Sequence, residues 1–247
     1  MRPVSLTEKE AAHSASVRSM FAGIARRYDL LNHVLSLNID KLWRRAVSRR
    51  LADILSRPDA AVLDVACGTG DLALQLNSSG PAAISGLDFC RPMLDIAAEK
   101  SARSGIDLPW IEGDAMALPF PDAAFDAVTI AFGLRNLPNV PKGLKELVRT
   151  IKPGGRLVIL EFSTPWIPGI KQLFGLYFTK VLPRIGGSIS GSRGAYEYLP
   201  DSVAKFPDQA GLSLLLAEAG LEDITYKNLS GGIAAIHEGK KPQGLLN

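Results

Sequence analysis

The chain has 247 residues and a formal net charge of +3, a size typical of one domain with appended helices and large enough to bury a core without disulfides. Cys67 and Cys90 have neither metal-ligand nor disulfide spacing, so we expect no metal site and a reducing, cytoplasmic environment. No apolar run approaches the roughly 20 residues of a membrane-spanning helix. We therefore expect no such helix, and no secretion signal at the N-terminus.

Positive charge is concentrated in the first quarter of the chain. Residues 1–57 contain 11 Lys and Arg against 5 Asp and Glu, whereas residues 58–247 contain 17 against 20. We therefore predict a basic helical extension or lid over residues 1–57 and a main domain over residues 58–247. A basic extension suits an anionic surface, although solvated helix faces are the commoner explanation.

Apolar residues recur at helical spacing from Val17 to Leu35, and a second basic helix is predicted over residues 41–55. After Pro58, strand and helix patterns alternate, which predicts an α/β fold with a mostly parallel, Rossmann-like sheet and helices on both faces. The predicted strands are 61–65, 84–88, 108–112, 125–131 and 157–162, and the predicted helices are 91–104 and 140–151, the second ended by Pro153-Gly154-Gly155.

Residues 164–206 interrupt this alternation with four prolines and six glycines, and are predicted to be an insert with a helix over 170–181 and loops elsewhere. A helix over 209–219 follows. Strands over 222–229 and 233–238 are then joined by Ser-Gly-Gly, which is typical of a hairpin. The sheet is therefore expected to end in an antiparallel pair.

A glycine-rich turn follows the first strand in the segment VLDVACGTGDLAL, residues 62–74. Gly68, Thr69 and Gly70 formally match the start of G-x-G-x-x-A, the dinucleotide fingerprint, and Asp88 at the end of the next strand is suited to hold ribose hydroxyls. An NAD-dependent oxidoreductase is therefore one hypothesis.

The carboxylates around this turn argue against a phosphate ligand. Asp64 lies in the strand and Asp71 follows the turn, and two carboxylates beside a pyrophosphate would repel it by at least about 1 kcal/mol. S-adenosylmethionine (SAM) fits better, because it combines adenine and ribose with positive charge and no phosphate. The simpler alternative is that Asp71 only begins a helix and Asp64 only ends a strand.

Two further strand ends strengthen the cofactor hypothesis. Asp114 and Ala115 follow the third strand, where a carboxylate would meet the adenine amino group, and Phe89 is placed to pack on the adenine face. All these residues lie at carboxyl ends of strands, where open α/β sheets bind ligands.

With these residues in view, the sequence resembles the class I SAM-dependent methyltransferases and, more narrowly, the ubiquinone/menaquinone biosynthesis C-methyltransferase family (UbiE/MenG). The resemblance covers nearly the whole chain, and the first and last segments together with FGLRN are its most specific parts. The segments are MFAGIARRYDLLNHVLSLNIDKLWRR (20–45), VLDVACGTGDLAL (62–74), GLDFCRPML (86–94), GDAMALPFPDAAFDAVTIAFGLRNLPN (113–139), LKELVRTIKPGGRLVILEFSTP (144–165) and AYEYLPDSVAKFP (195–207).

The resemblance implies transfer of the SAM methyl group to a ring carbon of a prenylated quinol, either demethylmenaquinol or the methoxy-benzoquinol of the ubiquinone pathway. It also implies a reversed last strand, and a role for Tyr28 in closing the extension over SAM. Cys90 and Ala131 stand where members of the family often have serine. Both lie near the expected adenosine pocket, so a polar contact there is in doubt.

Within FGLRN, Arg135 is the candidate partner for a substrate oxygen anion, because a guanidinium stays protonated, and Asn136 is suited to orient the hydroxyl. The alternative for Arg135 is an ordinary salt bridge. Tyr196 and Tyr198 are candidates for the ring pocket, or for core packing. None of the histidines is assigned as general base: His13 is expected in a mobile tail, His33 is either base or packed, and His237 is expected to be structural.

The prenylated substrate suggests a peripheral position at a membrane, with the basic extension and KQLFGLYFTKVL (171–182) on anionic lipid. Packing of both segments as a lid is an equal alternative. The remaining hypotheses are another SAM-dependent acceptor, and a noncatalytic or nucleic-acid-binding protein. The extension has few aromatic residues, so we expect no nucleic-acid partner. A homodimer is compatible with the sequence.

Overall fold

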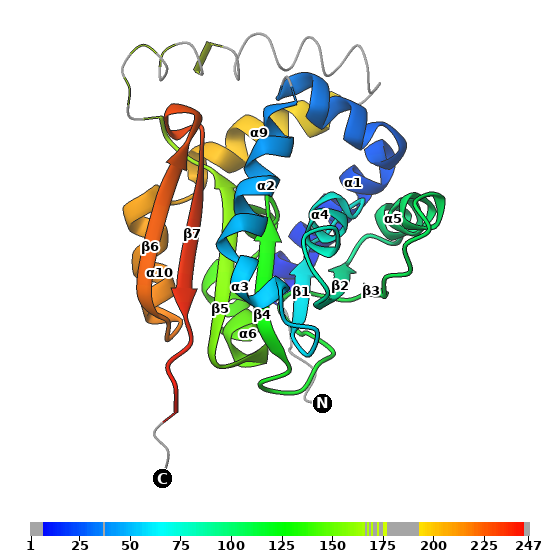
Figure 1. Cartoon of the computed structure of the whole chain (residues 1–247). Coiled ribbons are helices and arrows are strands. Elements are labelled where there is room, and N and C mark those ends of the chain that lie inside the picture. The colour runs from blue at the N-terminus through cyan, green and yellow to red at the C-terminus, as the bar shows by residue number, and fades with distance from the viewer. Residues whose placement is uncertain are drawn as a thin grey trace.

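The computed structural model describes residues 7–36, 38–165 and 193–244, with isolated positions between 167 and 176. Its centre is a seven-stranded sheet in the order β3-β2-β1-β4-β5-β7-β6 (Figure 1). The strands are β1 (Ala61–Val65), β2 (Ala83–Asp88), β3 (Trp110–Glu112), β4 (Phe125–Ala131), β5 (Ile151–Phe162), β6 (Glu222–Leu229) and β7 (Ala234–Lys240).

The strands from β3 to β5 are all parallel, and β7 runs antiparallel to both β5 and β6. The predicted parallel sheet and closing hairpin are therefore confirmed. The strand order reverses between β1 and β4, because the chain leaves β3 at one edge and returns on the other side of β1. Such a reversal opens a crevice at the carboxyl ends of the strands, which is where open α/β sheets bind ligands.

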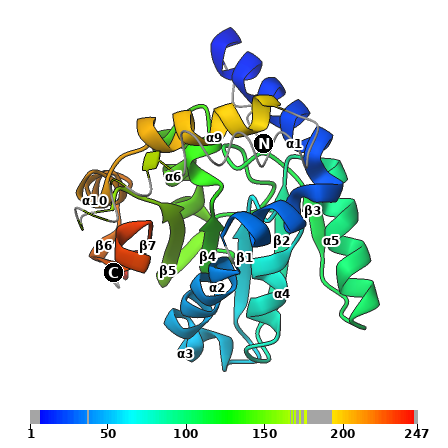
Figure 2. The same cartoon turned by 90° about the horizontal axis from the view of Figure 1, so that it is seen from above.

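Helices cover both faces of the sheet and its carboxyl-terminal end. One face carries α2 (Ile39–Arg50), α3 (Ala52–Leu55) and α4 (Asp71–Asn77), and the other carries α6 (Val140–Thr150) and α10 (Gln209–Glu218). The helix α5 (Arg91–Arg103) packs beside β3. Figure 2 shows α1 (Glu8–Leu35) and α9 (Arg193–Lys205) bordering the carboxyl-terminal end of the sheet, with α1 passing close to α5.

Several predicted boundaries differ from the structure. The helix expected over 41–55 is two helices, because the backbone leaves helical geometry at Leu51 (φ −103°, ψ 11°). β5 begins at Ile151, six residues earlier than expected, because the Pro-Gly-Gly segment continues as strand after α6 ends. The expected loop at the end of the insert contains α9 instead, and all but three isolated positions of the helix predicted over 170–181 lie outside the described residues.

Trp110 at the start of β3 explains two glycines of the fold. A Cβ atom on Gly86 or on Gly70 would lie 2.5 Å from the indole ring, and the Trp110 Nε1 donates a hydrogen bond to Ser101 Oγ at 3.1 Å. Gly70 also has φ +82°, which L residues with side chains rarely adopt. The second glycine of the turn is therefore required by its own backbone and by the packing of Trp110.

We expect Gly86→Ala to lower the free energy of unfolding by about 1–3 kcal/mol, because the new methyl group overlaps the Trp110 ring. The measurement is urea unfolding of the protein with Gly86 and with Gly86→Ala, each with Trp110 and with Trp110→Leu. The cost should be smaller in the Trp110→Leu background, where the overlapping ring is gone. An equal cost in both backgrounds would contradict this explanation.

Candidate active site

A pocket of about 670 Å³, counted to its open mouth, lies at the carboxyl ends of β1, β2, β3 and β4. This is the position that the strand reversal predicts. Eight residues proposed from the sequence line it: Tyr28, Gly68, Asp88, Phe89, Asp114, Ala115, Ala131 and Asn136.

Asp88 fixes the glycine turn, which we define as residues 68–70, against the end of β2. Its Oδ2 accepts a hydrogen bond from the backbone N–H of Gly68 at 2.8 Å, and its Oδ1 accepts one from Cys90 N at 2.8 Å. The carboxyl group is almost fully buried, and this burial raises its pKa. The side chain nevertheless lines the pocket, at the position expected for a ribose contact.

The end of the pocket beyond β3 suits an adenine ring. Asp114 lines it, and the Asp114 Oδ1 accepts a hydrogen bond from Met116 N at 2.8 Å, which leaves its second oxygen for an exocyclic amino group. Phe89 forms an adjoining wall, with the Arg18 guanidinium 5.3 Å from its ring centroid. Both residues line the pocket as expected, and their contact with adenine stays a prediction.

The ends of β1 and β4 meet under strain at the floor of the pocket. Ala66 (φ 51°) and Phe132 (φ 56°) both have left-handed backbone conformations and both line the pocket. A Cβ atom on Gly133 would lie 2.5 Å from the Cβ of Ala66, so the two turns pack closely. Strained residues of this kind persist where the surrounding structure holds them, often at functional sites.

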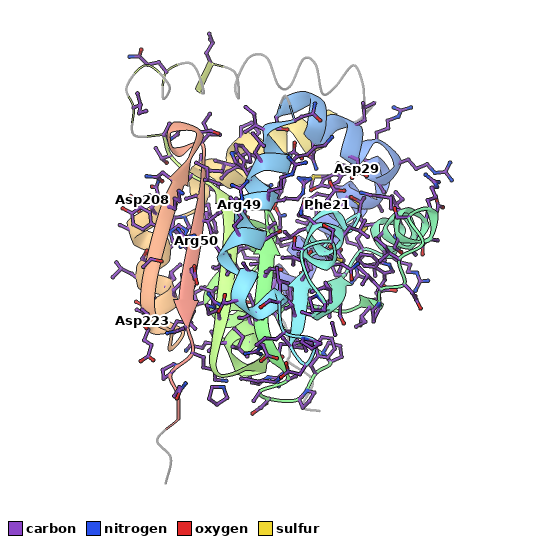
Figure 3. All side chains as sticks on the ribbon, viewed as in Figure 1. Phe21, Asp29, Arg49, Arg50, Asp208 and Asp223 are labelled. Carbon is purple, nitrogen blue, oxygen red and sulfur yellow. The ribbon has the colours of Figure 1, made fainter. Side chains whose placement is uncertain are left out.

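Helix α1 forms one wall with Ser14, Phe21 and Tyr28, which recur every seven residues. Figure 3 shows Phe21 on this helix, and its ring meets Tyr28 edge-on with centroids 5.9 Å apart. Burial raises the pKa of the Tyr28 phenol. Sequence reasoning proposed Tyr28 only, although the seven-residue spacing places all three side chains on one face of a helix.

Asp64 and Asp71 do not line the pocket, so the contact of these carboxylates with the ligand stays a prediction. Asp71 pairs with Arg44 Nη2 at 2.6 Å and with Lys100, so its charge is balanced. Asp64 is buried beneath the glycine turn and accepts a hydrogen bond from Thr129 Oγ1 at 2.7 Å. The argument against a phosphate therefore cannot rest on these two carboxylates.

Thr69, Gly70 and Arg135 also lie outside the pocket lining. The Arg135 side chain is only 7% exposed, and its Nη1 donates to Glu161 Oε2 at 2.8 Å and to the carbonyl of Phe132 at 2.7 Å. Arg135 therefore forms the salt bridge that the sequence analysis gave as the alternative. Its Nε is buried without a hydrogen-bond partner among the described residues.

Asn136 connects the pocket with α1 and α9. Its Nδ2 donates to Phe132 O at 3.2 Å, and its Oδ1 accepts from the Tyr198 hydroxyl at 3.1 Å. The Nε2 of His13 lies 3.2 Å from the Asn136 carbonyl oxygen. His13 belongs to α1, so its expected place in a mobile tail is wrong. Tyr196 lies in α9, but its side chain is outside the described part of the chain.

The other two histidines contribute nothing visible to the pocket. His237 is buried in β7, where its Nε2 lies 2.9 Å from Gln209 O and burial lowers its pKa. This agrees with the structural role expected for it. His33 lies in α1, but its side chain is outside the described part of the chain.

The glycine turn after β1, the carboxylates after β2 and β3, and a reversed β7 beside β5 define the class I SAM-dependent methyltransferases. The family model described as the ubiE/COQ5 methyltransferase family matches residues 8–241, and the chain belongs to this family. It is therefore a methyltransferase whose cofactor is SAM.

Curated relatives agree in sequence and length. A demethylmenaquinone methyltransferase from Thermus thermophilus is 49% identical over 225 residues, which cover 90% of this chain and 100% of the relative. A ubiquinone/menaquinone biosynthesis C-methyltransferase UbiE from Geobacter sp. (strain M21) is 44% identical over 233 residues, with coverage of 91% and 96%. A solved SAM-dependent methyltransferase from Thermotoga maritima shares the fold, with a TM-score of 0.64, 19% identity and coverage of 90% and 98%.

We expect Asp64→Asn to stabilise the protein more at about pH 8 than at about pH 5. Burial raises the pKa of Asp64 to about 7. The folded state therefore holds this proton up to a higher pH than the unfolded chain, whose carboxyl has a pKa of about 3.9. The wild type therefore loses stability progressively between about pH 4 and pH 7, whereas asparagine has no charge to bury. Each pKa unit corresponds to about 1.4 kcal/mol, so the gain is a few kcal/mol at most.

The measurement is urea unfolding of both proteins at the two pH values. Asp223→Asn is the control, because its side chain is 72% exposed. A stability difference between wild type and Asp64→Asn that did not change with pH would contradict a raised pKa.

Proposed function

We propose that this enzyme transfers the SAM methyl group to a ring carbon of a prenylated quinol, with demethylmenaquinol as the first candidate acceptor. The observation that carries the proposal is the match of the whole fold, extension included, to the ubiE/COQ5 family, together with relatives named for this reaction. The methoxy-benzoquinol of the ubiquinone pathway is the second candidate, supported by relatives named UbiE.

The reaction needs a nucleophilic carbon placed in line with the methyl group and the sulfur. Loss of the quinol hydroxyl proton moves electron density onto the ring, and the ring carbon forms a bond to the methyl group as the bond from sulfur to methyl breaks. The hydrogen on that carbon then leaves as a proton, which restores the aromatic ring, and the ring oxygen takes up a proton to regenerate the hydroxyl. The products are the methylated quinol, S-adenosylhomocysteine and one proton. The protein contributes mainly alignment and exclusion of water.

We propose that Arg135 and Asn136 hold the quinol oxygens. Asn136 lines the pocket, and the buried Nε of Arg135 is a donor without a hydrogen-bond partner among the described residues. Glu161 balances the guanidinium charge, so Arg135 acts on a substrate oxygen chiefly as an oriented hydrogen-bond donor. Tyr198, which donates to Asn136, is proposed to orient that amide, and Tyr196 to line the ring site.

The test is transfer of labelled methyl from SAM to chemically reduced demethylmenaquinol in detergent, with the ubiquinone-pathway quinol as a parallel acceptor. We expect label on the quinone ring. Removing Arg135 alone would strand the buried Glu161 carboxylate, at a cost of about 3–5 kcal/mol. The variant to compare is therefore Arg135→Gln combined with Glu161→Gln, which should lose at least roughly tenfold in kcat while still binding SAM.

Arg91→Ala is the matched control, because it removes an exposed arginine paired with Asp95 on α5. SAM binding without label on either quinol would reject the proposed acceptor. Full activity in the Arg135 and Glu161 double variant would reject the proposed role of Arg135.

We further propose that the junction of α1 and α2 contacts anionic lipid, which would bring the pocket to a membrane-bound substrate. Leu30 and Leu42 are 56% and 57% exposed there, beside the exposed cations Arg26, Lys41 and Arg45. The junction lies at the end of the molecule toward which β1 and β4 point (Figure 1). No helix in the described part of the chain is long and apolar enough to cross a membrane.

We expect the wild type to sediment with vesicles that contain phosphatidylglycerol, and Leu30→Ser combined with Leu42→Ser to bind several-fold more weakly. The control is Leu214→Ser on α10, where the side chain is 66% exposed and the surroundings are not basic. Equal binding by both variants would show that this junction is not the contact.

A further inference from the structure

We propose that Asp29 and Lys100 are positioning residues that hold the glycine turn against helix α1, so that SAM binding and docking of α1 strengthen each other. This inference rests on the SAM site described above and does not depend on which quinol accepts the methyl group.

Thr69 at the centre of the glycine turn supplies the first contact. Its side chain is buried, and its Oγ1 donates a hydrogen bond to Asp29 Oδ1 at 2.5 Å. The glycines on either side have φ of +55° and +82°, so the turn has no side chain of its own other than Thr69 to fix its conformation. The turn is therefore held from outside by α1, on which Figure 3 labels Asp29.

Lys100 joins three elements at the same point. Its Nζ lies 2.8 Å from Asp29 Oδ2 on α1, contacts Asp71 Oδ1 at the start of α4, and lies 3.5 Å from Thr69 Oγ1. The side chains of Lys100, Asp29 and Asp71 are only 23–30% exposed, so solvent screens these pairs less than it screens surface pairs.

Arg44 of α2 extends the same network. It donates to Asp71 Oδ2 at 2.6 Å and to Asp40 Oδ2 at 2.5 Å, and the side chains of Arg44 and Asp40 are 10% and 5% exposed. Alternating charges therefore connect both helices of the extension with the first turn of the helix that follows the glycine turn. Opposite charges arranged in this way resist separation of the extension from the main domain.

The same helix that carries Asp29 also forms a pocket wall. Tyr28 lines the pocket, and a Cβ atom on Gly68 would lie 3.9 Å from its ring. Docking of α1 thus brings the pocket wall and the anchor of the turn into place together. If docking raises the affinity for SAM, then SAM must favour docking by the same factor, because binding free energies are reciprocal.

The experiment measures S-adenosylhomocysteine affinity by calorimetry, and hydrogen exchange of α1 peptides with and without that ligand. The variants are Asp29→Ala, Asp29→Asn, Thr69→Val and Thr69→Ser. Asp95→Ala is the control, since it breaks an exposed pair on α5 whose side chains are 66% and 55% exposed.

In the wild type and in Asp95→Ala, we expect the ligand to slow exchange in α1. Asp29→Ala should raise the dissociation constant about tenfold or more, and its α1 peptides should exchange equally fast with and without saturating ligand. Asp29→Asn keeps an acceptor for Thr69 but loses the charge facing Lys100, so its affinity should fall between the two. Thr69→Ser keeps the hydroxyl and should bind more tightly than Thr69→Val.

Unchanged affinity in Asp29→Ala would overturn the proposal. So would weakened affinity with the ligand still slowing exchange in α1, because Asp29 would then act on the turn without coupling it to the helix. If Asp29→Ala does not fold, β4 and β5 will exchange fast. The proposal is then tested with Thr69→Val and Thr69→Ser, by S-adenosylhomocysteine affinity and by the effect of that ligand on exchange in α1. Normal coupling in a protein that methylates neither quinol would reject the proposed acceptor and leave this inference standing.

Discussion

The close approach of the ends of β1 and β4 is the constraint on which the site depends. The reversed strand order brings these two ends side by side, and the chain leaves both strands through residues with positive φ, Ala66 and Phe132. Gly133 is the residue that permits this approach, because a side chain there would overlap Ala66. The direction in which these two turns lead the backbone determines the position of the glycine turn. It also determines the positions of Asn136 and of the Arg135–Glu161 pair.

The N-terminal extension belongs to the site as much as to the periphery. It supplies one wall of the pocket through Phe21 and Tyr28, and a contact to the backbone of Asn136 through His13. Asp88 and Asn136 both line the pocket, and in the proposed assignment the cofactor lies against Asp88 and the acceptor against Asn136. Helix α1 reaches both sides, so it is placed to exclude water from the space where the methyl group moves.

The parts of the site that could be predicted from sequence are those fixed locally. Asp88 ends β2, and Phe89 and Asp114 lie within two residues of a strand end, so the strand pattern alone places them at the carboxyl edge. The β6–β7 hairpin was predictable for the same reason, since its turn residues adjoin its strands. Boundaries failed where a local signal was overridden, as in the strand that continues through Pro153-Gly154-Gly155.

The parts that could not be predicted depend on pairings between distant segments. The sequence does not show that Asp71 pairs with Arg44 and Lys100, because the fold brings these residues together. In the same way, it does not show that Arg135 pairs with Glu161. Charge in a sequence is visible, but its neutralisation is a property of the fold. The residues of α1 were missed for a different reason, because their periodicity was visible and only its meaning was not.

The spacing of Ser14, Phe21 and Tyr28 has a consequence for how this enzyme can vary in length. Each residue of an α-helix turns the following side chains by about 100°, so a single deletion between Ser14 and Tyr28 would rotate one end of the pocket wall away from the other. Insertions and deletions between Ser14 and Asp29 are therefore expected to disrupt either the pocket wall or the contact of Asp29 with the glycine turn. Between those points the helix has a fixed number of residues.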